Sequence, residues 1–478
     1  MEVPRPEHPR PDFQRSDWIN LNGSWQFEID NQKKGLESGY ASGKDLMGTI
    51  VVPFPPESKL SGVHELNFME SVWYRRKVKI PPDWHDARLI LHFGAVDYES
   101  WVWVNGMPVC HHKGGYSPFE SEITEFVNKA EEAEIVLRVL DDNRTGLQAC
   151  GKQSTKFESY GCHYTRVTGI WQTVWLERVP STYINRFRLT PDLGRRRIFL
   201  TVNATGRAAP STLGISVLQG DREISRSRSD LRLPSTSLSI DMAQLKMWSP
   251  EDPMLYPIRL ELKPQTGESD NVSSYFGMRS FTLEQSRILL NDKPRFLRMI
   301  LDQGYYPDGI YTAPSDEALR NDILISKEMG FEGARLHQKV FEPRFLYWCD
   351  VLGYLVAGEY ADWGADIVNP STHEDIMNEW SEVVQRDFNH PCILMWTPFN
   401  ERTFEKTDHT VRDFLQKMVR LTRGLDPTRP IIDTSGYIHV ETDIYDSHDY
   451  EQDPLKFRSH YDRFGRTGLS SDLWRHHK

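Results

Sequence analysis

The sequence contains little cysteine, no long apolar run and no excess of positive charge. Its 478 residues include five cysteines, at positions 110, 150, 162, 349 and 392. An odd number without a Cys-x-x-Cys pair excludes a complete disulfide framework and argues against a zinc ribbon or a redox motif. No window holds eighteen consecutive apolar residues, which argues against a membrane-spanning helix. We therefore expect a protein with reduced thiols and no membrane partner.

The charge balance is acidic. Lys and Arg number 57 against 68 Asp and Glu, so the formal net charge is −11. Such a surface repels the phosphates of nucleic acid, and we expect no nucleic-acid partner. The N-terminal residues also lack the apolar core of a signal peptide. We predict a cytoplasmic protein, with secretion after removal of a signal as the alternative.

The length suggests about three domains at roughly 150 residues each. Residues 1–181 contain short alternating runs, among them 88–93, 100–104 and 134–139, and Asn105-Gly106 is a strong hairpin signal. This pattern predicts a β-sandwich. Residues 182–283 continue with short strands and frequent turns, which fits a small immunoglobulin-like β-sandwich.

Residues 284–478 show a different pattern, in which strand-like runs alternate with helices. We expect helices from Ser315 to Gly330, over 376–388 and over 411–424, since apolar residues recur there at helical spacing. The predicted strands are 296–300, 333–337, 355–360, 392–396, 430–433 and 443–448. About six βα units predict a parallel sheet, either a barrel or a doubly wound sheet. No Gly-x-Gly-x-x-Gly follows a strand, which disfavours a dinucleotide site.

Polar residues gather where these strands end, and a (β/α)8 barrel builds its active site on that side. They are Asp302, Gln303, Arg335, His337, Glu359, Trp363, Asn400, Glu401 and His448. Carboxylates among aromatic side chains suit glycoside hydrolysis, which needs one carboxylic acid with a raised pKa and a second carboxylate. The set offers no nucleophile elbow for a Ser-His-Asp triad and no zinc-binding His-Glu-x-x-His helix.

Several segments, taken together, resemble glycoside hydrolase family 2, the family of β-galactosidases and β-glucuronidases. The most telling are 386–391, Arg-Asp-Phe-Asn-His-Pro, and 396–401, Trp-Thr-Pro-Phe-Asn-Glu. Residues 164–175 resemble the end of the family's N-terminal sugar-binding domain, and 248–256 the end of its immunoglobulin-like domain. The resemblance implies a jelly-roll sandwich, an immunoglobulin-like sandwich and a TIM barrel, in that order.

The resemblance also implies a retaining exo-β-glycosidase and roles for its residues. Glu401 resembles the general acid/base and Asn400 its partner on the sugar, while His337 and His390 resemble sugar-contacting or supporting histidines. We further expect Asp302, Gln303, Trp363 and His448 to contact a carbohydrate substrate, and Arg335 to brace Glu359 through a bidentate ion pair. Residues 151–153 and Tyr160 lie in a long loop that we expect to reach the barrel mouth.

The resemblance breaks near the C-terminus, where no Ser-Glu-Phe/Tyr-Gly-like nucleophile motif occurs. Asp449 and Glu451 do not match this motif and are poor candidates for the nucleophile. The sequence therefore predicts an incomplete barrel. Two hypotheses stay open: a glycosidase, intact or completed by another chain, and a catalytically inactive carbohydrate-binding fragment or remnant. An incomplete barrel predicts a partly open sheet or a homo-oligomer that covers the gap. No cofactor or metal site is evident, although the resemblance allows Mg²⁺ or Na⁺.

Overall fold

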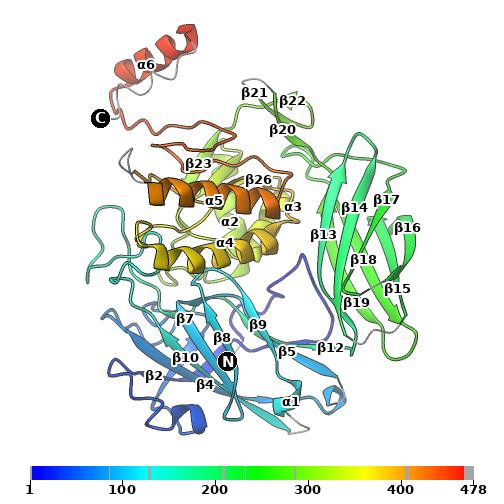
Figure 1. Cartoon of the computed structure of the whole chain (residues 1–478), viewed down its shortest axis with the longest axis vertical. Helices are drawn as coiled ribbons and strands as arrows, with labels where there is room; N and C mark the ends of the chain where they lie inside the picture. The colour runs from blue at the N-terminus through cyan, green and yellow to red at the C-terminus, as the bar shows by residue number, and fades with distance from the viewer. Residues whose placement is uncertain are drawn as a thin grey trace.

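The computed structural model describes residues 3–85, 87–127, 131–206, 210–231, 233–284, 287–403 and 409–467. Within those ranges the chain forms two β-sandwiches and a βα domain, which lie against one another (Figure 1). No helix among the described residues has both the length and the apolar character needed to cross a membrane.

The first sandwich is antiparallel and packs two sheets over a common apolar core. Alternating burial along Glu132–Leu140 shows the period of two that the sequence predicted, because successive side chains point to opposite faces of a sheet. The predicted hairpin is present, with Asn105 and Gly106 in left-handed conformation at the turn. The smaller sheet has the order β1 (Trp18–Asn20), β12 (Val174–Val179), β5 (Arg88–Phe93), β9 (Phe119–Glu122). The larger sheet has the order β3 (Gly48–Val52), β2 (Gly23–Ile29), β4 (Ser71–Lys79), β10 (Glu132–Leu140), β7 (Glu99–Val104), β8 (Met107–Lys113).

The second sandwich is smaller and has its own core of buried aliphatic and aromatic residues. Its sheets have three and four strands, in the orders β13-β14-β17 and β16-β15-β18-β19. This arrangement agrees with the predicted immunoglobulin-like domain. The strands are β13 (Tyr183–Asp192), β14 (Arg197–Thr205), β15 (Ser211–Gln219), β16 (Arg222–Leu231), β17 (Ser235–Asp241), β18 (Leu255–Pro264) and β19 (Asp270–Gly277).

The third domain is built on a four-stranded parallel sheet in sequence order, covered by helices. A short antiparallel sheet precedes it, formed by β20 (Phe281–Glu284), β21 (Arg287–Leu290) and β22 (Lys293–Pro294). The predicted helix that begins near Ser315 is confirmed. The Ser315 side chain caps this helix by accepting a hydrogen bond from the backbone of Ala318. The strands are β23 (Met299–Asp302), β24 (Gly333–Leu336), β25 (Leu355–Glu359) and β26 (Ile393–Thr397). The helices are α2 (Asp316–Glu328), α3 (Pro343–Leu352), α4 (His373–Asp387), α5 (His409–Leu425) and α6 (Pro454–Thr467).

Two of the six predicted barrel strands are not regular strands in the structure. Residues 430–435 run parallel to β26 and the residues after it, with bridges of Ile431 to Trp396 and of Ser435 to Asn400, but form no regular strand, and residues 443–448 adopt no strand. The acidic side chains of the second segment offer a physical reason. Asp443 Oδ2 accepts from Ile431 N and Asp446 Oδ1 from Gly436 N, so side chains take backbone donors that a further strand would otherwise bind. The described sheet is therefore open, with β23 at one edge.

Candidate active site

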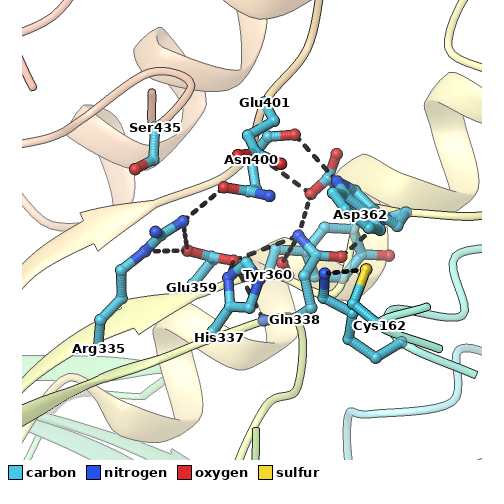
Figure 2. Close-up of polar contacts among 12 residues, drawn as sticks. Cys162, Arg335, His337, Gln338, Glu359, Tyr360, Asp362, Asn400, Glu401 and Ser435 are labelled. Atoms are coloured by element: carbon cyan, nitrogen blue, oxygen red, sulfur yellow. Dashed lines mark hydrogen bonds and ion pairs between the residues drawn. The ribbon is translucent and has the colours of Figure 1, made fainter. Parts of the chain in front are cut away.

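Glu359, the last residue of β25, is at the centre of a polar cluster at the carboxyl ends of the parallel strands (Figure 2). Its side chain is fully buried. Arg335 Nε donates to Oε2 at 2.7 Å, and His337 Nδ1 lies 2.9 Å from Oε1. Burial alone would raise the pKa of Glu359, but the Arg335 guanidinium and His337 outweigh burial and lower it. Glu359 is thus an anion that orients its neighbours, as predicted for its pairing with Arg335.

Asn400 has one hydrogen-bonding group that finds no partner among the described residues. Arg335 Nη2 donates to Asn400 Oδ1 at 2.6 Å, which fixes the orientation of the amide. The backbone of Asn400 is held on both sides, because its N donates to Asp362 Oδ1 and its carbonyl accepts from Trp363 Nε1. Asn400 Nδ2 is buried and has no acceptor among the described residues. A buried, oriented and unsatisfied donor favours a ligand at this position.

Glu401 lies beside Asn400 in a left-handed backbone conformation, with φ of 48°. Its Oε1 lies 2.6 Å from His448 Nδ1 and accepts a hydrogen bond from the Tyr450 hydroxyl at 2.5 Å. Burial would raise the pKa of Glu401, but hydrogen bonds from His448 and Tyr450 outweigh it and lower the pKa to about 2. This differs from the raised pKa that the sequence analysis expected of a catalytic acid. The reason is that both donors come from a segment 47 or more residues away.

His448 connects Glu401 to the rest of the cluster. Its Nε2 lies 3.3 Å from Arg335 Nη1 and 3.1 Å from Ser435 Oγ. Ser435 in turn donates to Asp446 Oδ2 at 2.5 Å. The prediction that His448 lies at the site therefore agrees with its position, although it contacts protein groups here.

A second set of contacts is centred on Asp362, which accepts a hydrogen bond from the backbone of Asn400. Gln338 Nε2 donates to Asp362 Oδ1 at 2.6 Å, and Arg402 Nε donates to Asp362 Oδ2 at 2.5 Å. Burial raises the pKa of Asp362, and the nearby Arg402 opposes this only in part. The sequence analysis did not select Gln338 or Arg402. Their only sequence signal is adjacency, since each directly follows a selected residue.

The long loop of the first sandwich reaches the barrel mouth, as the sequence analysis expected. Gly151 N donates to the Ala361 carbonyl at 3.1 Å, and Lys152 Nζ lies 3.6 Å from the centre of the Trp363 ring. A cation over an aromatic face is attractive, and this pair joins the two domains. Lys152 therefore occupies one face of Trp363, the residue predicted to contact sugar.

Two other residues of this loop contact groups of the first sandwich and of the loop itself. Gln153 Nε2 donates to the buried Asp97 at 2.6 Å, so Gln153 braces the interior of the sandwich. Tyr160 stacks on His163, with ring centres 4.8 Å apart.

The structure does not place His390 at the strand ends. His390 precedes β26, and its Nδ1 lies 2.6 Å from Asp350 in a fully buried environment. This corrects the expectation of a sugar contact: the histidine is a packing residue between the barrel and the immunoglobulin-like domain, where Tyr275 also donates to Asp350. Asp350, His390 and Cys392 could geometrically hold a metal ion. Asp350 already accepts from Tyr275 and from the Cys392 backbone, and His390 Nδ1 is paired with Asp350, whereas the buried His390 Nε2 has no partner among the described residues.

Asp302 ends β23 and Gln303 follows it, beside the Glu359 cluster. They line a cavity of about 550 Å³ beside β23 and α2. Burial raises the pKa of Asp302, whose carboxylate accepts a hydrogen bond from Gly304 N at 2.9 Å. The Asp302 carbonyl accepts a hydrogen bond from His337 N at 2.7 Å, so the backbone of Asp302 borders the cluster while its side chain faces the cavity.

Two β-sandwiches are followed by a βα domain whose strand ends gather carboxylates, an asparagine and histidines, which is the domain order and the kind of site expected from the resemblance to glycoside hydrolases. Comparison with protein families places the chain more narrowly. Residues 19–180 match the family 2 glycosyl hydrolase sugar binding domain, 182–279 match the glycosyl hydrolases family 2 domain, and 282–455 match the family 2 TIM barrel domain. The chain therefore belongs to glycoside hydrolase family 2.

Similar proteins carry glycosidase names. A putative β-glucuronidase of Formosa agariphila is 27% identical over 75% of this chain and 44% of its own length. A β-galactosidase of Thermoanaerobacter pseudethanolicus is 27% identical over 87% of this chain and 55% of its own length. The β-glucuronidase of Ruminococcus gnavus, solved with D-glucuronic acid, has a TM-score of 0.76 at 19% identity over 90% of this chain and 74% of its own, and it shares the fold. Across the curated relatives cited, the chain spans about half of their length.

Proposed function

We propose that this chain is a retaining exo-β-glycosidase of the β-galactosidase or β-glucuronidase type, with Glu401 as general acid/base. The observation that carries the proposal is the unsatisfied Nδ2 of Asn400 next to Glu401. A sugar hydroxyl is an acceptor of the right kind for this donor, and the bond would strengthen as charge develops on the ring. Glycosidase names among the relatives add support.

Protonation of Glu401 is the first requirement of this mechanism. A general acid must carry its proton at the working pH, whereas His448 and Tyr450 hold Glu401 ionised. In the proposed reaction, a substrate that displaces the Tyr450 hydroxyl removes one of the two stabilising bonds, and the pKa of Glu401 rises. Proton transfer to the leaving oxygen then follows substrate binding.

The second requirement is a carboxylate about 5–5.5 Å from the first. Glu359 is fully engaged by Arg335 and His337, and Asp362 by Gln338 and Arg402. Asp449 and Glu451 accept backbone hydrogen bonds that shape their own loop. The hydrogen bonds of these four carboxylates assign the role of nucleophile to none of them, so the proposed retaining mechanism names only the acid/base.

The second candidate function is carbohydrate binding without turnover. The ionised state of Glu401 favours it, because an anion at this position accepts hydrogen bonds from sugar hydroxyls but donates no proton. The two functions share the Asn400 contact and differ only in the fate of the glycosidic bond.

Hydrolysis of nitrophenyl β-glucuronide and nitrophenyl β-galactoside separates the two candidates. The proposal expects turnover by the full chain that falls at least about 100-fold in Glu401→Gln, a typical loss for a general acid/base. Turnover that survives this substitution contradicts the role of Glu401. Absence of turnover with retained binding of glucuronate or galactose, measured by calorimetry, supports the binding function.

The Asn400 contact has its own control. Asn400→Ala should weaken sugar binding under either function, whereas Asn203→Ala, at a half-buried position on β14 of the second sandwich, should leave it unchanged. Equal affinity of the Asn400→Ala variant and the unmodified chain would contradict a ligand at this donor.

A further inference from the structure

Two residues of the site have a left-handed backbone although both carry a Cβ. The φ angle is 53° at Gln338 and 48° at Glu401. Residues other than glycine rarely adopt this conformation, and they keep it only where the surrounding contacts impose it. Gln338 is fully buried and Glu401 is half-buried. The contacts that hold these two residues are therefore part of how the site is built.

The Asp362 carboxylate holds the residues on both sides of Glu401. Figure 2 shows Asp362 beside Asn400 and Glu401. Asn400 N donates to Asp362 Oδ1 at 3.0 Å, and Arg402 Nε donates to Asp362 Oδ2 at 2.5 Å. Arg402 Nη2 also donates to the Asp362 carbonyl at 2.5 Å. One residue thus fixes the residue before Glu401 and the residue after it, which limits the rotation of the Glu401 backbone.

Gln338 connects Asp362 to the Glu359 cluster. Its Nε2 donates to Asp362 Oδ1 at 2.6 Å, and its backbone N donates to Glu359 Oε1 at 3.1 Å. Its Oε1 accepts a hydrogen bond from Trp363 N at 2.9 Å. Asp362 is fully buried, so water does not readily replace a hydrogen bond that is lost there. Both left-handed residues are therefore tied to Asp362, Gln338 directly and Glu401 through its two neighbours.

We propose that Asp362 is a positioning residue, which keeps Glu401 in its left-handed conformation and directs the Glu401 carboxylate toward His448 and Tyr450. An ionised carboxylate accepts hydrogen bonds with both oxygens, which suits the three donor groups that converge on this side chain. An amide at the same position would turn an N–H group toward one of these donors. Only the effect on turnover rests on the proposed glycosidase function, because the state of Glu401 can be measured without a substrate.

Asp362→Asn separates position from charge, because the two effects on the pKa of Glu401 have opposite signs. Removal of a nearby negative charge lowers the pKa of a carboxyl group. Burial raises the pKa of Glu401, and hydrogen bonds from His448 and Tyr450 lower it to about 2, so loss of these bonds raises it. We expect the pKa of Glu401 to rise in the variant toward the ordinary value of a glutamate. Carbon NMR at about pH 4 should then show Glu401 ionised in the unmodified chain and partly protonated in Asp362→Asn, and Glu401→Gln would assign the signal.

Asp426→Asn is a matched control. Asp426 is also fully buried, and it accepts from Arg429 Nη1 at 2.6 Å and from Trp396 Nε1 at 2.8 Å. The two substitutions should destabilise the fold to a similar degree, but Asp426→Asn should leave the pKa of Glu401 unchanged.

Arg402→Lys is a second test variant, which serves if Asp362→Asn does not fold. The lysine keeps the positive charge but lacks the planar group that donates to Asp362 from two nitrogens. A rise in the pKa of Glu401 in Arg402→Lys would therefore report a change of position rather than of charge, and an unchanged pKa in this variant contradicts the proposal.

Turnover gives a second readout if the chain hydrolyses nitrophenyl β-glycosides as proposed. Asp362→Asn should lower kcat at least about tenfold and change KM less than about twofold, because proton transfer needs the acid within reach of the leaving oxygen. An unchanged or lower pKa of Glu401 in Asp362→Asn overturns the proposal, and so does an equal rise in Asp426→Asn or a raised pKa with an unchanged kcat. A chain without turnover in any form contradicts the glycosidase function, and the titration of Glu401 then decides the role of Asp362 alone.

Discussion

His448 Nδ1 lies 2.6 Å from Glu401 Oε1, and the opposite nitrogen of the same ring lies 3.3 Å from Arg335 Nη1. The imidazole of His448 therefore connects Glu401, in the loop after β26, with the cluster built on β24 and β25. Because Arg335 also binds Glu359, the two glutamates of the site belong to a single network. Substitutions within residues 435–450 should therefore change the pKa of Glu401.

Tyr450→Phe should raise the pKa of Glu401 above its value of about 2. The substitution removes one hydrogen-bond donor to Oε1 and leaves His448 in place. A carbon NMR titration of glutamate carboxyl groups would measure the shift, and the Glu401→Gln variant would assign the signal. An unchanged titration in Tyr450→Phe would show that the hydroxyl does not stabilise the Glu401 anion.

Arg335→Met should destabilise the barrel by about 3 kcal/mol, because it leaves the buried Glu359 carboxylate without its ion pair. The same substitution made in a Glu359→Gln background should cost much less, since no buried charge remains unpaired. Urea unfolding of the four proteins of this double-mutant cycle would measure the coupling. Additive losses would contradict a stabilising ion pair.

Gly151→Ala should cost more stability than Gly161→Ala. Both glycines have left-handed backbone conformations, with φ of 55° and 52°, so the conformational penalty is shared. A Cβ at residue 151 would lie 2.1 Å from the Gln338 carbonyl oxygen, whereas one at residue 161 meets no atom within 4 Å. Thermal unfolding should show about 1 kcal/mol lost for Gly161→Ala and clearly more for Gly151→Ala. Equal losses would show that the Gln338 carbonyl oxygen does not limit the size of residue 151.

Glu57→Gln should make stability less sensitive to a rise in pH from about 4.5 to about 8. Burial raises the pKa of Glu57 to about 8, and hydrogen bonds from Thr168 offset this only in part. The folded state thus binds a proton that the unfolded state releases near pH 4.5, so stability falls as the pH rises from about 4.5 to about 8. Melting temperatures at pH 5 and pH 8 should differ less in Glu57→Gln than in the unmodified chain. Glu158→Gln, at an exposed position, should not alter the difference.

Much of the fold could be predicted from local patterns. Alternation along Glu132–Leu140, the Asn105-Gly106 turn and the Ser315 cap each act within a few residues, and each has the predicted effect. The segment after residue 429 was harder, because its acidic side chains compete with the backbone for hydrogen bonds. Asp443 and Asp446 accept from the backbone of Ile431 and Gly436, and residues 443–448 form no regular strand.

The site was predicted only in part. Arg335, His337, Glu359, Asn400, Glu401 and His448 do lie together, because parallel strands bring their carboxyl ends to one edge. His390 lies elsewhere, because it precedes β26 and binds Asp350. Asp302 and Gln303 border the cluster but line a neighbouring cavity. Gln338 and Arg402 were missed because their contacts with Asp362 form only in the folded chain.

The sequence by itself determined the order of domains and the family, because periodic burial and contiguous motifs are local properties of the chain. Only the tertiary structure decided the state of Glu401, since its pKa depends on His448 and Tyr450, which folding brings into contact. It also decided the place of Lys152, a residue of the first sandwich that lies over Trp363 of the barrel. Charges and hydrogen bonds act through space, and distance in space is set by packing rather than by position along the chain.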